Sequence, residues 1–528
     1  MRDIRQAKMG TRGTRIGQSV MFVCLLAWVA ACATTREGVS RAPPVDRDRP
    51  QDLRSAFSGL HGTDEFGMAN VITDNAEAWA IRWKMIEGAR ESIDVATFIL
   101  SDDVVGRATV AQLLQKAKEG VRVRLLIDGR GSLSFLLPTA GRGILYELAR
   151  HENATVHIYN RAHIAIFNAL TKFSPVPVVA STHDKILVVD GRLAITGGRN
   201  LAREYFAQPG DMPGAFYDTE ILVHGSDVVR GLLDIFEDEF DAAQAGKVTP
   251  LGASSKKDDK ELVRRYQQMN GWLSGASSKA EKSLAENPAW RGILQVEPRV
   301  LHESELSVLW KSSEVGNWQD SINHAIFRFV DGAQRRIVIQ TPYFILTKDG
   351  VRLLEEAAAR GVEIHVFTNS PVSSDSPISQ ALFVESWPEI LARVPTMRIF
   401  VPNQARVMHA KRAVFDDEAT LIGSYNLDLL SMRINSEVAV GVWSAGFAAQ
   451  NLAEMEQELA DKNTLEYRIQ RDESGNALRY PEGHPQAGKI QVAFGPADHC
   501  PKEYEERRRL LSMVKSAKDL LSVQPAFW

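Results

Sequence analysis

The sequence of 528 residues contains only three cysteines, Cys24, Cys32 and Cys500. Three cysteines cannot form a disulfide framework, and they exclude a cysteine-rich zinc or iron–sulfur site. The sequence also lacks a strong excess of either charge, because 62 Lys and Arg stand against 66 Asp and Glu. This balance argues against a protein whose main task is to bind nucleic acid. Apolar residues make up 44% of the chain, which is enough to build more than one hydrophobic core.

The apolar run from Val20 to Ala31 is too short to span a bilayer comfortably as a helix, since a span needs about 20 apolar residues. Five basic residues precede this run, and two alanines end it directly before Cys32. The order of a basic start, an apolar run and small residues predicts a secretory signal peptide over residues 1–31. A buried N-terminal helix with an incidental cysteine is the alternative interpretation.

The end of this segment, Val29-Ala30-Ala31-Cys32, resembles the bacterial lipoprotein signal. In that family the peptide is cut before the cysteine, which then carries acyl chains. The resemblance implies a mature chain that starts at Cys32 and is lipid-anchored to a membrane of the bacterial cell envelope, on the periplasmic side. Ala33 matches the lipoproteins that are sorted to an outer membrane. The mature chain would carry a net charge of −8, from 57 basic and 65 acidic residues.

Composition divides the rest of the chain into two bodies. Residues 32–70 are rich in Arg, Asp and Pro and carry few aliphatic side chains, which predicts a disordered tether. A second polar stretch, residues 251–295, predicts an insertion between domains. The two bodies are then a first domain at residues 71–250 and a second domain at residues 296–528. The C-terminal extension of the second domain is apolar enough to pack or to contact lipid.

Each body contains the same order of elements: a β-branched strand, a segment with helical spacing and a second strand. Such units imply crossover connections and parallel strands. The sequence therefore predicts an α/β fold made of two similar halves that are related by a pseudo-twofold axis. The three segments lie at residues 92–100, 104–119 and 121–128 in the first half, and at residues 337–346, 350–360 and 362–368 in the second half.

A sequence motif follows these units in both halves. It reads HxKx4Dx6G[GS]xN, with identical spacing in the two copies. One HxK pair would carry no information, whereas two full copies in a duplicated chain are highly specific. The residues are His183, Lys185, Asp190, Gly197, Gly198 and Asn200 in the first half, and His409, Lys411, Asp416, Gly423, Ser424 and Asn426 in the second half.

Strand geometry brings the polar residues of each motif together. Residues two apart on a strand share a face, so the histidine and the lysine of each motif point in the same direction. The Asp-Gly pair of the first motif predicts a hairpin, whose returning strand brings the asparagine back beside the histidine. The glycines there let backbone and ligand approach closely. Across the pseudo-twofold axis, two imidazoles, two ammonium groups and two amides would form one anion site with a spare acid–base pair.

This pair of motifs resembles the phospholipase D superfamily, and the resemblance covers most of the chain from about residue 75 onward. It implies one shared active site, in which one histidine attacks phosphorus to form a phosphohistidine. The other histidine protonates the leaving alcohol and later deprotonates the acceptor, which suits a side chain whose unperturbed pKa is about 6.5. The resemblance also implies that the lysines and asparagines bind the non-bridging oxygens. No metal and no other cofactor is expected, since the remaining histidines show no metal-ligand spacing.

Within the superfamily, the sequence is similar to bacterial cardiolipin synthases of the C type. The similarity lies in Gly-Gly-Arg-Asn-Leu at 197–201, Met-His-Ala-Lys at 408–411 and Gly-Ser-Tyr-Asn-Leu-Asp at 423–428. It implies transfer of a phosphatidyl group onto the glycerol of phosphatidylglycerol, with phosphatidylethanolamine as the donor in some members. The expected partners are phospholipids and a membrane surface, and no nucleic acid. Leu430 stands where such enzymes often have arginine, so the choice of headgroup stays open.

The resemblance also assigns supporting residues. Glu437 stands where the family keeps a carboxylate that orients the histidine of the opposite half. Glu220, in the segment Asp218-Thr219-Glu220-Ile221, is its expected counterpart. Asp190 and Asp416 occupy the hairpin turns, where Asp commonly forms local hydrogen bonds, and we expect them to be structural supports.

The two halves are not chemically equivalent. Ser424 matches a phosphate-contacting hydroxyl of the family, whereas Gly198 takes that place in the first half. Glu437 is the better-matched carboxylate, and it would orient His183 of the opposite half. A histidine so oriented presents its other nitrogen unprotonated, as a nucleophile requires. The sequence therefore favours His183 as the nucleophile and His409 as the general acid and base.

Three other functions stay open. Members of the superfamily with such a site hydrolyse phospholipids or cleave nucleic acid, although a net charge of −8 disfavours a nuclease. A lipoprotein that binds lipid without turning it over is the non-enzymatic alternative. The sequence does not distinguish the possible donor and acceptor headgroups, nor transfer from hydrolysis.

The substitution Cys32→Ser tests the predicted anchor. The variant has no thiol to acylate, so we expect it to leave the membrane fraction and appear in the soluble fraction. Membrane flotation and mass spectrometry of the N-terminal peptide measure this outcome. Wild-type protein that is bound to membranes through an unmodified Cys32 would contradict the prediction.

Overall fold

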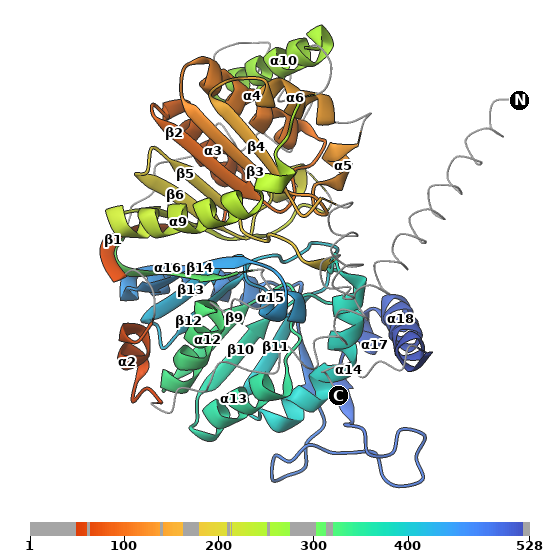
Figure 1. Cartoon of the computed structure of the whole chain (residues 1–528). Coiled ribbons are helices and arrows are strands. Elements are labelled where there is room, and N and C mark those ends of the chain that lie inside the picture. Colours follow the sequence, from red (N-terminus) through yellow and green to blue (C-terminus); the bar gives the residue numbers. More distant parts are fainter. Residues whose placement is uncertain are drawn as a thin grey trace, which may run out of the picture.

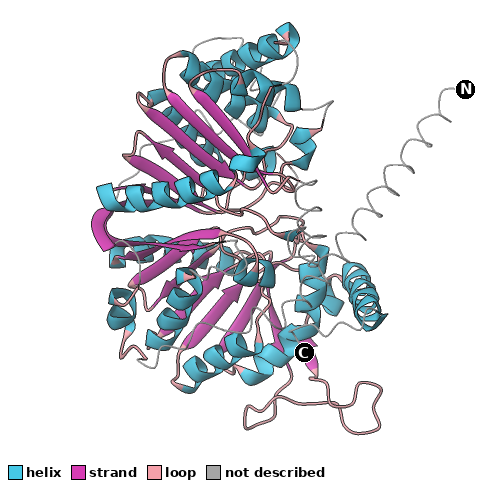
Figure 2. Cartoon of the chain, viewed as in Figure 1, coloured by secondary structure: helices cyan, strands magenta, loops and turns pink. Residues whose placement is uncertain are grey.

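In the computed structural model, two similar α/β halves lie one above the other and share one continuous β-sheet (Figure 1, Figure 2). The sheet has 16 strands in the order β16-β15-β11-β10-β9-β12-β13-β14-β8-β1-β7-β6-β5-β2-β3-β4. The structure describes residues 49–60, 64–137, 141–161, 179–208, 212, 214–250, 254–274, 302–312 and 320–520.

Read outward from the centre of the sheet, the strands follow each other in the same order in both halves. The first half contributes β1 (Asp64–Ile72), β7 (Glu220–His224), β6 (Leu193–Gly197), β5 (Ile186–Val189), β2 (Ser92–Thr97), β3 (Arg122–Asp128) and β4 (Ala154–Tyr159). The second half contributes β8 (His302–Lys311), β14 (Glu437–Trp443), β13 (Ala419–Gly423), β12 (Arg412–Phe415), β9 (Arg336–Gln340), β10 (Glu363–Phe367) and β11 (Met397–Pro402), and continues with β15 (Thr464–Ile469) and β16 (Val492–Phe494).

The two halves join through β1 and β8, which pair antiparallel with Asp64 opposite Ser307. Within each half, the three outer strands β2–β3–β4 or β9–β10–β11 run parallel, and the hairpin strands pair antiparallel. The predicted α/β fold with two similar halves is confirmed. The predicted strand–helix–strand segments also appear, although the first strand of each unit is shorter than predicted.

Helices cover both faces of the sheet and complete its three largest apolar cores among the described residues. One core packs α3 (Asn75–Gly88), α4 (Val104–Lys118) and α6 (Arg142–Ala149) on the parallel strands of the first half. A second core packs α12 (Ser321–Gly332), α13 (Lys348–Ala359) and α14 (Pro377–Arg393) on those of the second half. On the opposite face, α9 (Ser226–Ala242) and α16 (Ala445–Ala460) cover the central strands of both halves (Figure 1). The remaining α-helices are α5 (Leu133–Leu136), α15 (Leu429–Arg433), α17 (Pro496–His499) and α18 (Pro501–Leu520), together with α2 and α10, which are described below.

The repeat extends to the ends of corresponding helices. The side chain of Asp103 accepts from backbone N–H groups at the start of α4, and Thr347 does the same at the start of α13. After each helix stands a glycine with positive φ, Gly120 at +93° and Gly361 at +88°. A positive φ favours glycine because it has no Cβ. These glycines therefore end both helices.

The predicted disordered tether at residues 32–70 is wrong for its second part. Helix α2 (Leu53–Ser58) packs on α12, and β1 begins at Asp64. Leu53, Ala56, Phe57 and Leu60 are buried, and their spacing is that of one face of a helix. Four apolar side chains on one face are enough for docking even where the average composition is polar. Residues 1–48, with the predicted signal peptide and Cys32, lie outside the described residues.

The predicted polar insertion at residues 251–295 is in part a helix of the first half. Helix α10 (Lys256–Ser274) packs on α4 and α6. Its side chains Leu262 and Met269 are buried in the first core, and the Trp79 indole donates to Met269 Sδ at 3.1 Å. Most side chains of this helix are polar or charged, so the composition of the segment did not reveal its apolar face. Residues 275–301 lie outside the described residues.

None of the helices in the described ranges is both long and apolar enough to cross a bilayer. In the C-terminal extension, α18 packs on α14 (Figure 1). Leu511 is buried there, so this part of the extension packs on the protein. The residues after 520 lie outside the described residues.

The variant Phe57→Ala tests whether α2 belongs to the fold. Phe57 is 0% exposed and lies near the rings of Phe329 and Trp443, with centroids at 6.2 Å and 5.6 Å. Removing a buried aromatic ring costs about 3–5 kcal/mol, so we expect a large loss in the free energy of unfolding, measured by denaturant titration. Phe66→Ala is the matched control, because Phe66 is 71% exposed. Equal stability of the two variants would contradict the packing of α2.

Candidate active site

The hairpins β5–β6 and β12–β13 carry the two motifs to the junction of the halves. In each motif, the histidine and the lysine lie directly before the first hairpin strand, and the asparagine follows the second strand. All six side chains belong to buried residues, with exposed fractions between 1% and 7%. The hairpins start at the carboxyl ends of the parallel strands, which is the usual place for ligands in α/β sheets.

His183 is held by the second half of the molecule. Its ring Nδ1 lies 3.0 Å from Glu437 Oε2, and its backbone N–H donates to Ser436 O at 3.2 Å. The neighbouring Thr182 forms a short parallel bridge with Ser436. The backbone and the ring of this histidine are therefore both positioned by residues from the opposite half.

His409 is held by the first half in the same way. Its ring Nδ1 lies 2.7 Å from Asp218 Oδ2, and its backbone N–H donates to Tyr217 O at 2.6 Å. Tyr217 and Met408 form the corresponding parallel bridge. An Nδ1–H that donates to a carboxylate leaves Nε2 as the nitrogen that faces chemistry. The two motifs thus build one site, in which each histidine depends on the other half.

The expected supporting role of Glu220 is wrong, because Asp218 takes it. The Glu220 carboxylate forms a bidentate ion pair with Arg82 and lies 3.5 Å from Arg199. It is 0% exposed and therefore neutralises buried arginines rather than orienting His409.

Strand register explains the difference. Gly197 lies opposite Glu220 in the pair β6–β7, and Gly423 lies opposite Ala439 in the pair β13–β14. Glu220 therefore corresponds to Ala439, and the orienting carboxylate stands two residues earlier in both halves. Asp218 and Glu220 have the same parity along the chain, so alternation on a strand cannot distinguish them.

Gly198 and Ser424 are matched to the length of these carboxylates. A Cβ at Gly198 would lie 2.0 Å from Asp218 Oδ1, so only glycine leaves room for this carboxylate. In the second half, Ser424 Oγ donates to Glu437 Oε2 at 2.5 Å and accepts from Val438 N at 3.0 Å. The Ser424 hydroxyl therefore helps to fix the orienting glutamate, and its expected contact with a phosphate stays a prediction.

The two lysines bring positive charge into a buried place. Lys185 Nζ donates to His183 O at 2.7 Å, and Lys411 Nζ donates to His409 O at 2.5 Å. Burial lowers the pKa of Lys185 to about 7 and that of Lys411 to about 8. An anionic ligand would therefore stabilise the charged form of both lysines and raise their pKa values.

The histidines are also shifted toward the neutral form. Burial and the charges of Lys185 and Lys411 lower the pKa of His183 well below its ordinary value. Burial and Lys411 lower the pKa of His409 as well, although Asp218 opposes this shift. Both imidazoles are therefore neutral near pH 7 in the empty site.

The two asparagines have different partners. Asn200 Oδ1 accepts from Ile99 N at 3.0 Å, and its Nδ2 donates to Tyr205 OH at 2.9 Å. Asn426 Oδ1 is buried and has no hydrogen-bond partner within the part of the chain that the structure describes. Asn426 thus keeps acceptor capacity that Asn200 has already used.

Asp190 and Asp416 support the hairpins from their turns, as expected. Their backbones have φ of +53° and +48°. Each carboxylate accepts hydrogen bonds of 2.7–3.0 Å from three consecutive backbone N–H groups, at residues 90–92 and 334–336 respectively. These segments begin β2 and β9, so each aspartate ties its hairpin to the neighbouring parallel strand.

Sequence reasoning missed the aromatic rings beside the histidines. Phe98 meets the ring of His183 edge-on at a centroid distance of 5.0 Å, and Tyr205 meets that of His409 at 5.2 Å. The ring centroids of Phe216 and His409 are 5.5 Å apart. No motif spacing marks these residues, which reach the site only through the loops that follow β2 and β6.

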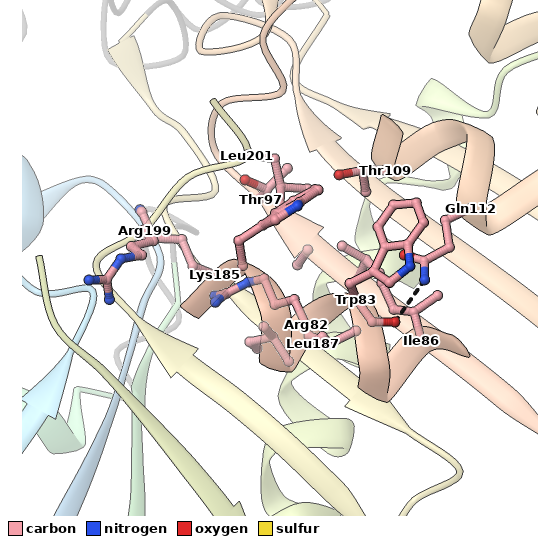
Figure 3. A pocket seen from close by; sticks show the side chains of 14 residues that line it. Arg82, Trp83, Ile86, Thr97, Thr109, Gln112, Lys185, Leu187, Arg199 and Leu201 are labelled. Atoms are coloured by element: carbon pink, nitrogen blue, oxygen red, sulfur yellow. Dashed lines mark hydrogen bonds between the residues drawn. The ribbon is translucent and has the colours of Figure 1, made fainter. Parts of the chain in front are cut away.

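A small cavity of about 30 Å³ lies beside Lys185, between α3, α4 and the sheet (Figure 3). Arg82, Trp83 and Gln112 line it, and Gln112 Nε2 donates to Trp83 O at 2.7 Å. A cavity of about 60 Å³ lies beside Lys411 in the matching place of the second half. Such volumes hold a few water molecules, so these cavities are too small for a phospholipid headgroup.

The part of the chain that the structure describes contains no group of three His, Cys, Asp or Glu residues that could hold a metal ion. The positive charge at the site comes from the two motif lysines and, beside His183, from Arg130. Such fixed ammonium groups can stabilise charge on a phosphate in place of a cation.

The chain matches the family model described as "Cardiolipin synthase, PLD-like domain" at residues 83–237 and 326–459. The two segments contain one motif each and together make up more than half of the chain. The chain belongs to this family. The resemblance inferred from the two motifs is confirmed, and the protein is an enzyme of the phospholipase D type.

Relatives and a solved structure agree with this assignment. Cardiolipin synthase C of Escherichia coli (strain K12) is 27% identical over 404 residues, which cover 71% of this chain and 81% of the relative. Probable cardiolipin synthase YwiE of Bacillus subtilis (strain 168) is 23% identical over 397 residues, which cover 75% and 66%. The crystal structure of phosphatidylserine synthase of Haemophilus influenzae Rd KW20 has a TM-score of 0.56 at 13% identity and covers 89% of this chain and 100% of that chain, a likeness in fold.

The variants Asp218→Asn and Glu220→Gln distinguish the orienting carboxylate from the structural one. An amide in place of Asp218 cannot stabilise a protonated His409, so we expect kcat to fall by about 10²–10⁴-fold, the range of acid–base catalysis. Glu220→Gln leaves Arg82 and Arg199 poorly neutralised and is expected to lower Tm, with little change in kcat for the folded enzyme. An equal loss of kcat in both variants, measured well below either Tm, would contradict the assignment.

Proposed function

We propose that the protein transfers the phosphatidyl group of one glycerophospholipid to a hydroxyl of phosphatidylglycerol, and so makes cardiolipin. The observation that carries this proposal is the pair of buried histidines, each with its own lysine and each oriented by a carboxylate of the other half. The family membership and the cardiolipin synthase relatives support the same chemistry.

In the first half-reaction, Nε2 of His183 attacks the phosphorus of the donor lipid. An N–P bond forms, and the P–O bond to the headgroup alcohol breaks. His409 donates a proton to the leaving oxygen, so the alcohol departs neutral. Glu437 accepts from Nδ1–H of His183 and stabilises the positive charge that develops on this ring.

In the second half-reaction, the deprotonated His409 takes the proton of the acceptor hydroxyl. The acceptor oxygen attacks phosphorus, the N–P bond breaks, and His183 returns to its starting state. Water in place of the lipid hydroxyl would give phosphatidic acid by the same steps. Transfer and hydrolysis therefore differ only in which hydroxyl reaches His409.

The lowered pKa values in the empty site suit an anionic substrate. A phosphodiester between Lys185 and Lys411 raises the pKa of both lysines and of His409, because opposite charges favour the charged forms. Binding of the lipid thus protonates the general acid that the first half-reaction needs. As the pH rises, Lys185 loses its charge near pH 7 and Lys411 near pH 8, so the affinity for the phosphodiester falls over this range.

The nucleophile is assigned to His183 because its carboxylate is the more firmly fixed. Glu437 accepts hydrogen bonds from Ser424 and Ser431, both at 2.5 Å. The pKa of His183 is also lowered far by burial and by surrounding cations, so its Nε2 stays free of a proton. The direct phosphate contact expected of Ser424 is not needed for this assignment.

The predicted acyl group on Cys32 would hold the enzyme at the periplasmic side of the cell envelope, where its lipid substrates lie. The signal in residues 1–32 carries this part of the proposal. A nuclease is the less favoured function, because the mature chain has a net charge of −8 and would repel a polyanion.

The variants His183→Ala and His409→Ala test the assignment of the nucleophile. His183→Ala is expected to abolish both product and covalent labelling by a donor whose phosphorus is radiolabelled. His409→Ala should still form a phosphohistidine from a donor with a good leaving group, because acid assistance then matters little. Peptide mapping of acid-quenched enzyme locates the label. Wild-type enzyme labelled on His409 would reverse the assignment.

Chelation tests the expectation that no metal takes part. Purified enzyme is incubated with vesicles of labelled phosphatidylglycerol, with and without phosphatidylethanolamine, and the products are identified by mass spectrometry. Activity is expected to survive excess EDTA, since Lys185 and Lys411 supply the charge that a cation would otherwise bring. Loss of turnover in EDTA that one divalent ion restores would contradict the two-histidine scheme.

A further inference from the structure

The two halves present opposite charges beside their histidines. After β3 stands Arg130, whose guanidinium lies 5.7 Å from the centre of the Phe98 ring, which in turn contacts His183. After β10 stands Asp375, which is exposed. One end of the site is therefore cationic and the other is anionic, although both ends come from corresponding loops.

Hydrogen bonds fix the loop of Asp375 against the second motif. Asn369 at the start of this loop donates to Met408 O at 2.7 Å and accepts from Met408 N at 2.9 Å, directly before His409. Near its other end, Asp375 Oδ1 accepts from Tyr343 OH at 2.9 Å. The carboxylate is thus tied to the His409 side of the site.

Tyr343 belongs to a segment that is bonded to the neighbour of Asn426. Thr341 Oγ1 accepts from Leu427 N at 3.3 Å, and Ile345 N donates to Leu427 O at 2.9 Å. The buried Asn426 Oδ1, which has no partner among the described residues, lies next along the chain. The segment that carries Tyr343, and with it Asp375, is therefore tied to the chain of the second motif.

The negative charge of Asp375 is unfavourable in a site that binds a phosphodiester. The charge of Asp375 raises the pKa values of His409 and Lys411, and so opposes burial, which lowers them. The same charge repels a phosphodiester. A positive group on the substrate would turn this repulsion into attraction, whereas a neutral polyol headgroup would not.

We propose that Asp375, supported by Tyr343, binds the primary ammonium of an amino-alcohol headgroup as it leaves on the His409 side. An ammonium group has three N–H donors and one charge, which match the acceptors and the charge of this subsite. The inference rests on the proposed function, because it requires His409 to face the leaving alcohol. The headgroup leaves as a neutral hydroxyl that carries its ammonium, with the hydroxyl proton supplied by His409.

The variant Asp375→Asn tests the subsite in single turnovers with one donor lipid at a time. We expect the ratio of kcat/KM for phosphatidylethanolamine to kcat/KM for phosphatidylglycerol to fall at least about tenfold, because only the ammonium headgroup loses a charge partner. Asp375→Glu is expected to keep the preference for the ammonium headgroup. Asp349→Asn is the matched control, because this aspartate is 54% exposed on α13 and lies outside the site; it should change neither value.

Binding gives a second readout that needs no turnover. In a His183→Ala background, calorimetry with short-chain phosphatidylethanolamine and phosphatidylglycerol is expected to show a preference for the ammonium lipid that Asp375→Asn removes. If the wild-type enzyme turned over neither lipid, the proposed function would be refuted. The binding preference, if still observed, would support the ammonium subsite independently.

Two results would overturn the subsite. Equal losses with both donors, accompanied by a shifted pH profile, would show that Asp375 tunes His409 rather than the headgroup. Unchanged selectivity in both turnover and binding would show that no ammonium is bound there.

Discussion

The site depends on the two carboxylate–imidazole contacts that cross between the halves. Glu437 orients His183, and Asp218 orients His409, so neither half contains a histidine together with its own carboxylate. All four groups are buried. Removing one partner leaves a buried polar group without its hydrogen bond, which costs about 1–3 kcal/mol and more where the remaining group is charged. The antiparallel junction of β1 and β8 and the two short bridges between halves hold these pairs in register.

The halves achieve the same orientation with different side chains. A short aspartate works with Gly198, which leaves space for its carboxylate, while a longer glutamate works with Ser424, which hydrogen-bonds to it. The result is a site with pseudo-twofold geometry and unequal electrostatics. Unequal electrostatics are what a double displacement needs, because one histidine must carry a bond to phosphorus while the other carries a proton.

Much of this site could be predicted from the sequence. Two copies of one motif at identical spacing identified the six polar residues, and the repeated strand–helix–strand segments identified the two halves. The register of β6 against β7 could not be predicted, because Asp218 and Glu220 stand two residues apart and the alternation of a strand does not distinguish them. Helix α2 was missed for another reason: its polar composition outweighed four apolar side chains on one face.

The charged residues that loops bring to the site could also not be predicted from the sequence. Asp375 lies 34 residues before His409 in the chain, and its loop is tied to the second motif by hydrogen bonds from Tyr343 to Asp375 and from Asn369 to Met408. Strand and helix periodicity carry no information about such approaches. The repeated elements of the fold are therefore readable from the sequence, whereas the features that differ between the halves appear only in three dimensions.

The tautomer of the two histidines is the property that the account depends on most directly. Nitrogen-15 NMR of histidine-labelled enzyme, with His183 and His409 assigned from the spectra of their alanine variants, reports which ring nitrogen carries the proton. Both rings are expected to be neutral at pH 7 with the proton on Nδ1, as donation to Glu437 and Asp218 requires. A proton on Nε2 of His183 in the folded enzyme would contradict its orientation by Glu437 and its role as the nucleophile.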